Sequence, residues 1–234
     1  MSINLVVASP TRVVACADSR VCFSDPAIPT ADNGAQKLFQ AGERSILGYV
    51  GIGALTGLNY DSDQRDNPRK LLAELSAYHG QLVASSATQT AFLKRIMAGT
   101  PVVFSAWALT RKESGEIEIA ELKFPLRDRG DGTPHLAEPE LMVATLMPKP
   151  KLVFCNPPDP EFDPFTATIL RLAGEINPND PDADILAEVD RVFAEAIRRD
   201  PACALHIGGT IATAVIDEGG FRWLRKSAVS EATQ

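Results

Sequence analysis

The chain holds few of the residues on which several classes of protein depend. Its 234 residues include only three histidines and four cysteines, and the cysteines do not form closely spaced pairs. Zinc and redox motifs need such pairs, so we expect neither a metal site nor a cofactor. No apolar run approaches the roughly 18 residues that a membrane-spanning helix requires, which argues against a membrane protein.

Positive charge is also in short supply. Lysine and arginine total 23 against 30 aspartates and glutamates, so the formal net charge is −7. A general nucleic-acid-binding protein would show a basic face, and we expect no nucleic-acid partner. The N-terminal residues lack the basic stretch, apolar run and cleavage site of a secretory signal. The chain is therefore expected to be cytoplasmic.

Apolar residues, by contrast, are plentiful enough for a complete core, at 45% of the chain. A length of 234 residues suits one large domain or two small ones. We expect a single domain over residues 1–234. Short runs rich in β-branched residues and bounded by turn residues predict a series of strands. They are Asn4–Ala8, Arg12–Ala17, Lys37–Gln40, Ser45–Val50, Val102–Thr110, Glu116–Lys123, Thr210–Ile216 and Phe221–Arg225.

Apolar residues at helical spacing predict several helices. They are Arg69–Tyr78, Ser85–Ala98, Phe165–Ile176 and Asp184–Arg199. Two other segments predict irregular surface, because Pro125–Pro139 is charged and glycine-rich and Met147–Pro164 is rich in proline. Helices in pairs between antiparallel strands favour an α+β fold, in which two sheets are sandwiched between helix layers.

The residues able to carry chemistry gather near the N-terminus. With Met1 removed, Ser2 becomes the first residue, at the head of an apolar strand. Three further motifs follow, on strands or at their ends: Ala17-Asp18-Ser19-Arg20, Gln36-Lys37-Leu38-Phe39 and Leu47-Gly48-Tyr49-Val50-Gly51-Ile52-Gly53. Together these segments resemble the proteasome β-subunit family of N-terminal-nucleophile hydrolases, which includes smaller bacterial relatives. The resemblance implies the four-layer αββα sandwich of that family.

The spacing of the motifs carries much of the resemblance. In the family, an Asp-Ser-Arg-like motif begins sixteen residues after the nucleophile, and Asp18 lies sixteen residues after Ser2. The family's lysine usually follows the aspartate by sixteen residues, whereas Lys37 follows Asp18 by nineteen. A longer loop accounts for the difference at little cost, because loop-closure entropy grows slowly with length.

The resemblance implies a mechanism that these residue types suit. A serine hydroxyl needs a base to take its proton, and the α-amino group of Ser2, with an ordinary pKa of roughly 7.7–8.0, can serve. The Lys37 ammonium would disfavour protonation of that amine, while Asp18 would hold Lys37 by a charge-assisted hydrogen bond. The oxyanion hole and the substrate-binding strand are expected at Gly51, Gly53 and Arg20.

Supporting positions later in the chain depart from the family pattern. Asp200 fits an Arg-Asp motif after the late helix, but Cys203 stands where a serine is usual. The glycine pair Gly208-Gly209 comes four residues late, and no glycine-serine-glycine-like turn occurs between Met142 and Asn156. A cysteine is a weaker hydrogen-bond partner than a hydroxyl group, so these positions bear on whether the site is active.

Two hypotheses of different classes follow. The first is a serine-type N-terminal-nucleophile peptidase or amidohydrolase that acts on peptides or amides and associates into a ring or another homo-oligomer. The second is a catalytically inactive subunit of the same fold, with a role in assembly or binding. Loss of Met1 separates the two hypotheses, because the Ser2 nitrogen is acylated while Met1 is present and cannot act as a base. Retention of Met1 would therefore favour the inactive subunit. Two lesser alternatives are a small-molecule amidase on the same scaffold and a cysteine enzyme using Cys203 and His206.

Overall fold

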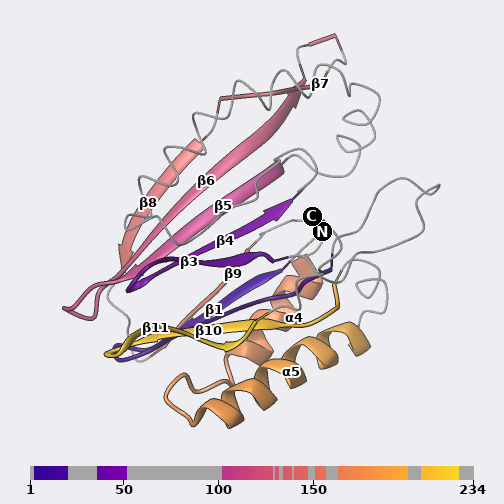
Figure 1. The fold of residues 1–234 in the computed structure, drawn as a ribbon. Coiled ribbons are helices and arrows are strands. Elements are labelled where there is room, and N and C mark those ends of the chain that lie inside the picture. The colour runs from indigo at the N-terminus through magenta and orange to yellow at the C-terminus, as the bar shows by residue number, and fades with distance from the viewer. Residues whose placement is uncertain are drawn as a thin grey trace, which may run out of the picture.

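The computed structural model of the protein describes residues 3–20, 36–51, 102–128, 130–131, 134–138, 140–146, 151–156, 163–199 and 207–226. These residues form two antiparallel sheets that face each other, with two helices packed against one of them (Figure 1). The helices are α4 (Asp163–Ala173) and α5 (Asp182–Arg199).

The sheet under the helices has five strands in the order β11-β10-β2-β1-β9. Their bounds are β1 Asn4–Ala8, β2 Val13–Ala17, β9 Leu152–Asn156, β10 Ala212–Asp217 and β11 Gly220–Arg225. The second sheet has the order β3-β4-β5-β6-β7, and β8 also pairs with β6. Their bounds are β3 Leu38–Gly42, β4 Ser45–Gly51, β5 Val102–Arg111, β6 Ile117–Asp128, β7 Pro134–Leu136 and β8 Glu140–Leu146.

Strand β1 is buried on both faces, and its sequence shows why. Side chains of a strand point alternately to its two faces. Leu5 and Val7 belong to the apolar cluster shared with the helices, whereas Val6 and Ala8 belong to the cluster between the two sheets. An uninterrupted apolar run is therefore what this central position requires, and the same alternation continues in β2.

Helix α5 packs on this sheet through one apolar stripe. Its buried residues recur at helical spacing: Ile185, Val189, Val192, Phe193 and Ala196. Acidic residues lie in its first turn and Arg198 and Arg199 in its last, an order that suits the helix dipole. Among the residues that the structure describes, no helix is both long enough and apolar enough to cross a membrane.

The four-layer αββα sandwich expected from the sequence is wrong. The described part of the chain is mostly antiparallel β-sheet, and its two helices lie on one outer face instead of both (Figure 1). The helices predicted at Arg69–Tyr78 and Ser85–Ala98 fall outside the described residues. Helical periodicity shows that a segment has one apolar face, but it does not show which sheet that face packs against. The expectation of helix layers on both outer faces was wrong for this reason.

The two segments interpreted as irregular surface contain strands. Strand β7 lies within Pro125–Pro139, and β9 lies within Met147–Pro164. Charged residues and glycines misled the prediction in the first segment, and prolines that lie outside β9 misled it in the second. The prolines of the first segment that the structure describes are compatible with a sheet. Pro134 is the first residue of β7, and Pro125 lies at a register shift between β5 and β6. A strand accepts a residue without an N–H group at such places.

Strand β8 contrasts with these buried strands. It pairs with β6 from Ile117 to Lys123, yet its side chains are mostly exposed. Leu141, Met142 and Val143 are 58%, 52% and 46% exposed. This part of the second sheet therefore contributes little to the apolar cluster between the two sheets.

Candidate functional site

Strand register brings three separate parts of the chain to the end of β2. Strand β1 pairs antiparallel with β2, so that Asn4 lies opposite Ala17, and β10 pairs with the other edge of β2, so that Ala212 also lies opposite Ala17. Ile3, Asp18 and the residues just before β10 must therefore meet. The N-terminal end of the chain and the residues near Gly208 become neighbours through this pairing.

Asp18 is the centre of this meeting point. Its Oδ1 accepts the backbone N–H of Ile3 at 2.9 Å, and its Oδ2 accepts the N–H of Arg20 at 3.1 Å and that of Gly208 at 3.3 Å. The Lys37 ammonium donates to Oδ2 at 3.0 Å. Four donors thus converge on one carboxylate, which satisfies the hydrogen-bonding capacity that a buried carboxylate needs.

The Asp18–Lys37 ion pair is buried and spans the two sheets. The side chains of Asp18 and Lys37 are 0% and 2% exposed. Asp18 follows β2 in one sheet, whereas Lys37 immediately precedes β3 in the other. Lys37 also donates to the carbonyl oxygen of Arg20. A buried pair with such additional hydrogen bonds can offset the cost of removing two charges from water.

Ser19 ties the same loop to the start of β10. Its backbone N–H donates to the carbonyl oxygen of Gly208 at 3.1 Å, and its hydroxyl oxygen accepts the N–H of Thr210 at 2.9 Å. The loop after β2 is therefore bound to the residues just before β10 through Ser19 as well as Asp18. We refer to Asp18, Lys37 and the groups of Ile3, Arg20 and Gly208 that contact them as the Asp18 site.

The structure brings together some of the residues predicted for the site. Asp18, Lys37 and Arg20 are in direct contact, and Arg20 contributes its backbone groups. Gly51 is the last residue of β4, opposite Phe104 of β5. The other predicted residues, Ser2, Gly53, Asp200 and Cys203, lie outside the described residues. Their assigned roles, and that of Gly51 in an oxyanion hole, stay predictions.

Sequence reasoning missed the contact that Gly208 makes with Asp18. The glycine pair comes four residues later than in the family pattern, yet the Gly208 N–H donates to Asp18 Oδ2. The available signal was the position of the pair directly before a predicted strand, which antiparallel pairing places beside the end of β2. Gly48, in the glycine-containing strand motif, has a packing role instead: a Cβ there would lie 2.4 Å from the buried Trp107 ring.

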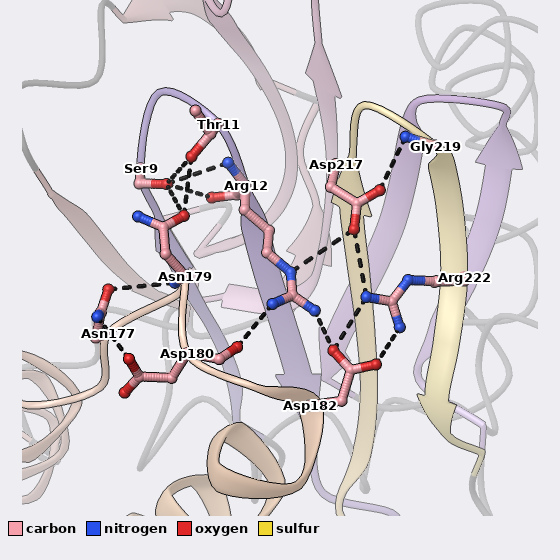
Figure 2. A network of polar contacts seen from close by, with 10 residues as sticks. All are labelled: Ser9, Thr11, Arg12, Asn177, Asn179, Asp180, Asp182, Asp217, Gly219 and Arg222. Carbon is pink, nitrogen blue, oxygen red and sulfur yellow. Dashed lines mark hydrogen bonds and ion pairs between the residues drawn. The ribbon is translucent and has the colours of Figure 1, made fainter.

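A second polar cluster lies at the opposite end of the β1–β2 hairpin (Figure 2). The Arg12 guanidinium contacts Asp182, donates to the Asp180 carbonyl oxygen at 2.9 Å and lies 3.8 Å from Asp217. Arg222 donates to Asp182 at 3.0 Å and to Asp217 at 3.3 Å. Hydrogen bonding to Arg222, with a contribution from Arg12, lowers the pKa of Asp182 to about 2. We call these four charged side chains the Arg12 cluster.

An open depression of about 290 Å³ lies beside the Arg12 cluster. It is lined by Thr11, Arg12, Asn179, Asp217 and Glu218. The Asn179 side-chain oxygen accepts hydrogen bonds from Ser9 at 3.0 Å and Thr11 at 2.9 Å (Figure 2). These contacts join the β1–β2 turn to the loop before α5, which is a structural role. No group of three or more His, Cys, Asp or Glu side chains within the described ranges is arranged to hold a metal ion.

Comparison with known proteins finds a similarity of fold. No family model matches the chain, and no curated protein matches it. Solved structures do match, among them a mutant of Anbu, a proteasome-related protein from Hyphomicrobium sp. strain MC1. That similarity has a TM-score of 0.52 at 12% identity, and it covers 100% of this chain and 89% of that chain. The fold of this protein is therefore similar to that of Anbu, and at this identity the similarity concerns the fold alone.

Proposed function

We infer that the protein is an N-terminal-nucleophile peptidase or amidohydrolase, with Ser2 as nucleophile once Met1 has been removed. One observation carries this proposal. Asp18 accepts the N–H of Ile3, the residue bonded to Ser2, and also binds the Lys37 ammonium. The carboxylate thus holds the start of β1 and a buried cation together, which is the arrangement that a reactive N-terminal residue needs.

The proposed reaction uses groups of the chain itself. The Ser2 hydroxyl oxygen attacks the carbonyl carbon of a peptide or amide, and the Ser2 α-amino group takes the hydroxyl proton. Collapse of the tetrahedral intermediate breaks the C–N bond, and the amine returns the proton to the leaving nitrogen. Water then hydrolyses the serine ester in the same way. The positive charge of Lys37 would keep the amine neutral and stabilise the developing alkoxide.

The proposal extends to the setting of the enzyme. We propose that copies of the chain associate into a ring or another homo-oligomer, that the substrates are peptides or amides, and that the enzyme acts in the cytoplasm. Light scattering coupled to size-exclusion chromatography tests the first point. A panel of peptides and acyl amides tests the second, and it separates a peptidase from a small-molecule amidase.

The decisive test is covalent labelling of the processed protein. Protein shown by intact mass to lack Met1 is treated with a serine-reactive electrophile, and the N-terminal peptide is examined for an adduct. Labelling of Ser2 is expected, together with its loss in Ser2→Ala and a much lower rate in Lys37→Met. Ser9→Ala is the matched control, because Ser9 lies in the β1–β2 turn away from Asp18. Absence of an adduct on a confirmed N-terminal serine would rule out the proposal.

A non-catalytic subunit with an assembly or binding role is the second candidate. The observation favouring it is that the acceptors of Asp18 are all engaged by neighbouring parts of the fold. A buried ion pair that only joins two sheets would have the same contacts. N-terminal sequencing of the protein from its native host separates the candidates, since retention of Met1 favours the subunit.

A further inference from the structure

Gly208 holds the loop after β2 through both of its backbone polar groups. Its N–H donates to Asp18 Oδ2 at 3.3 Å, and its carbonyl oxygen accepts the Ser19 N–H at 3.1 Å. Gly208 precedes β10 by only a few residues, so the pairing of β10 with β2 sets its position. The backbone of Gly208 therefore has a fixed position at one side of the Asp18 site.

The side chain of Arg20 lies against Gly208. A Cβ built on Gly208 would lie 2.8 Å from Arg20 Cζ, 2.9 Å from Nε and 3.0 Å from a terminal guanidinium nitrogen. Real Cβ atoms essentially never show contacts under 3.0 Å, as two of these are, and all three nearest atoms belong to one guanidinium group. The space that Gly208 leaves open by lacking a side chain is occupied by Arg20.

The two adjacent glycines are needed for different reasons. Gly209 has a φ of 73°, a left-handed conformation that glycine adopts without steric cost. Gly208 is not among the described glycines with positive φ. Its backbone would therefore accept alanine, and the three nearest atoms that the new methyl group would meet belong to the Arg20 side chain.

The backbone of Arg20 connects this contact to the ion pair. Its N–H donates to Asp18 at 3.1 Å, and its carbonyl oxygen accepts from the Lys37 ammonium. The Arg20 peptide thus contacts both members of the pair, so any effect of the side chain on this backbone would reach Asp18 and Lys37. Such an effect matters in an active site, where about 1 Å of misplacement can lower a rate by roughly a hundredfold.

We propose that Arg20 is a positioning residue, whose guanidinium packs on Gly208 and thereby fixes the backbone groups that orient Asp18 and Lys37. This interlock differs from the role beside the substrate that the sequence suggested for Arg20. Its structural part stands on the contacts alone, whereas its effect on catalysis rests on the proposed function of Ser2.

A double-mutant cycle tests the interlock. Four processed proteins are compared: the parent, Gly208→Ala, Arg20→Ala and the double variant. The first readout is the NMR signal of the Lys37 ammonium, assigned by its loss in Lys37→Met, and the second is the rate of Ser2 labelling. Gly208→Ala and Arg20→Ala alone should each shift the Lys37 signal and slow labelling by about tenfold or more. In the Arg20→Ala background, Gly208→Ala should add less than about twofold, because the new methyl group meets no guanidinium.

The outcomes separate the interlock from the proposed function. Equal effects of Gly208→Ala in both backgrounds, or an unchanged Lys37 signal in Arg20→Ala, would overturn the interlock. The Lys37 signal of Arg20→Ala tests the interlock even if Gly208→Ala does not fold. Failure of the parent to label Ser2, together with a coupled shift of the Lys37 signal, would sink the proposed function and support the interlock. Gly219→Ala, in a turn near Asp217, is the control substitution and should change neither readout.

Discussion

The β1–β2 hairpin has charged groups at both ends, and the two ends use them differently. At one end, the Asp18–Lys37 pair is almost completely shielded from solvent. At the other end, Arg12 is 11% exposed while its partner Asp182 is 44% exposed. Both ends join the hairpin to other elements, and both combine ion pairs with hydrogen bonds to backbone groups.

The difference lies in what happens when a partner is lost. A charge at the exposed end can turn to water, so exposed pairs contribute only about 0–1 kcal/mol. A charge left alone at the buried end has no such alternative, and breaking a buried pair costs about 3–5 kcal/mol. Burial, more than the number of contacts, should therefore decide how much stability is lost when one of these charged side chains is removed.

The largest loss of stability is expected for Asp18→Ala. Lys37 would be left without its carboxylate, and the N–H groups of Ile3 and Gly208 would lose their acceptor. We expect the free energy of unfolding to fall by about 3–5 kcal/mol, measured by urea denaturation. Lys37→Met should cost less, because Asp18 keeps its backbone donors. A larger loss in Lys37→Met than in Asp18→Ala would contradict this account.

At the exposed end, the two arginines should differ from each other. Arg12→Ala removes a mostly buried guanidinium that contacts Asp182 and the Asp180 carbonyl oxygen, and a loss of about 1–3 kcal/mol is expected. Arg222 is 43% exposed, and its replacement by alanine should cost about 0–1 kcal/mol. Parallel denaturation curves of the two variants check the ranking, and equal losses would show that burial is not the deciding factor.

The sequence predicted most of the strands that are set by a local run of apolar residues. It predicted less of the structure that depends on strand pairing and on helix packing. The continuous apolar runs of Asn4–Ala8 and Val13–Ala17 are strands, as expected from buried hydrophobic residues between turns. The strands β7 and β9 were missed because the charged, glycine-rich residues around β7 and the prolines on either side of β9 gave a local turn signal that pairing overrides. The helix layers were wrong because local periodicity contains no information on which face of a sheet receives a helix.

The site shows the same division. Asp18 and Lys37 could be singled out because their residue types and spacing fit a known pattern, and the structure places their side chains in contact. The contact of Gly208 with Asp18 was missed, because the position of the glycine pair before a predicted strand points to it only once the pairing of β10 with β2 is known. The packing of Arg20 on Gly208 depends on a side-chain position that no spacing in the sequence encodes.

The exposed end should also respond to acid in a defined range. The pKa of Asp182 is about 2 in the folded protein, below the ordinary value of 3.8. Because the folded pKa is depressed, its stabilising effect is fully present above about pH 3.8 and is lost as pH falls through about 2. The difference in unfolding free energy between the parent and Arg222→Ala should shrink over that range. A difference that stays constant down to pH 2 would contradict the assignment.

The smallest effect is expected on the surface of α5. Arg198 donates to Glu195 at 2.7 Å, a shorter distance than the 3.0 Å between Lys37 and Asp18. Yet the Arg198 side chain is 70% exposed, so water replaces the lost contact, and Arg198→Ala should leave the unfolding midpoint unchanged. Thermal and urea denaturation of Arg198→Ala beside Lys37→Met check this directly. If Arg198→Ala lost as much stability as Lys37→Met, the donor–acceptor distance would decide how much an ion pair stabilises the fold. The predicted contrast would instead mean that exclusion of water decides it.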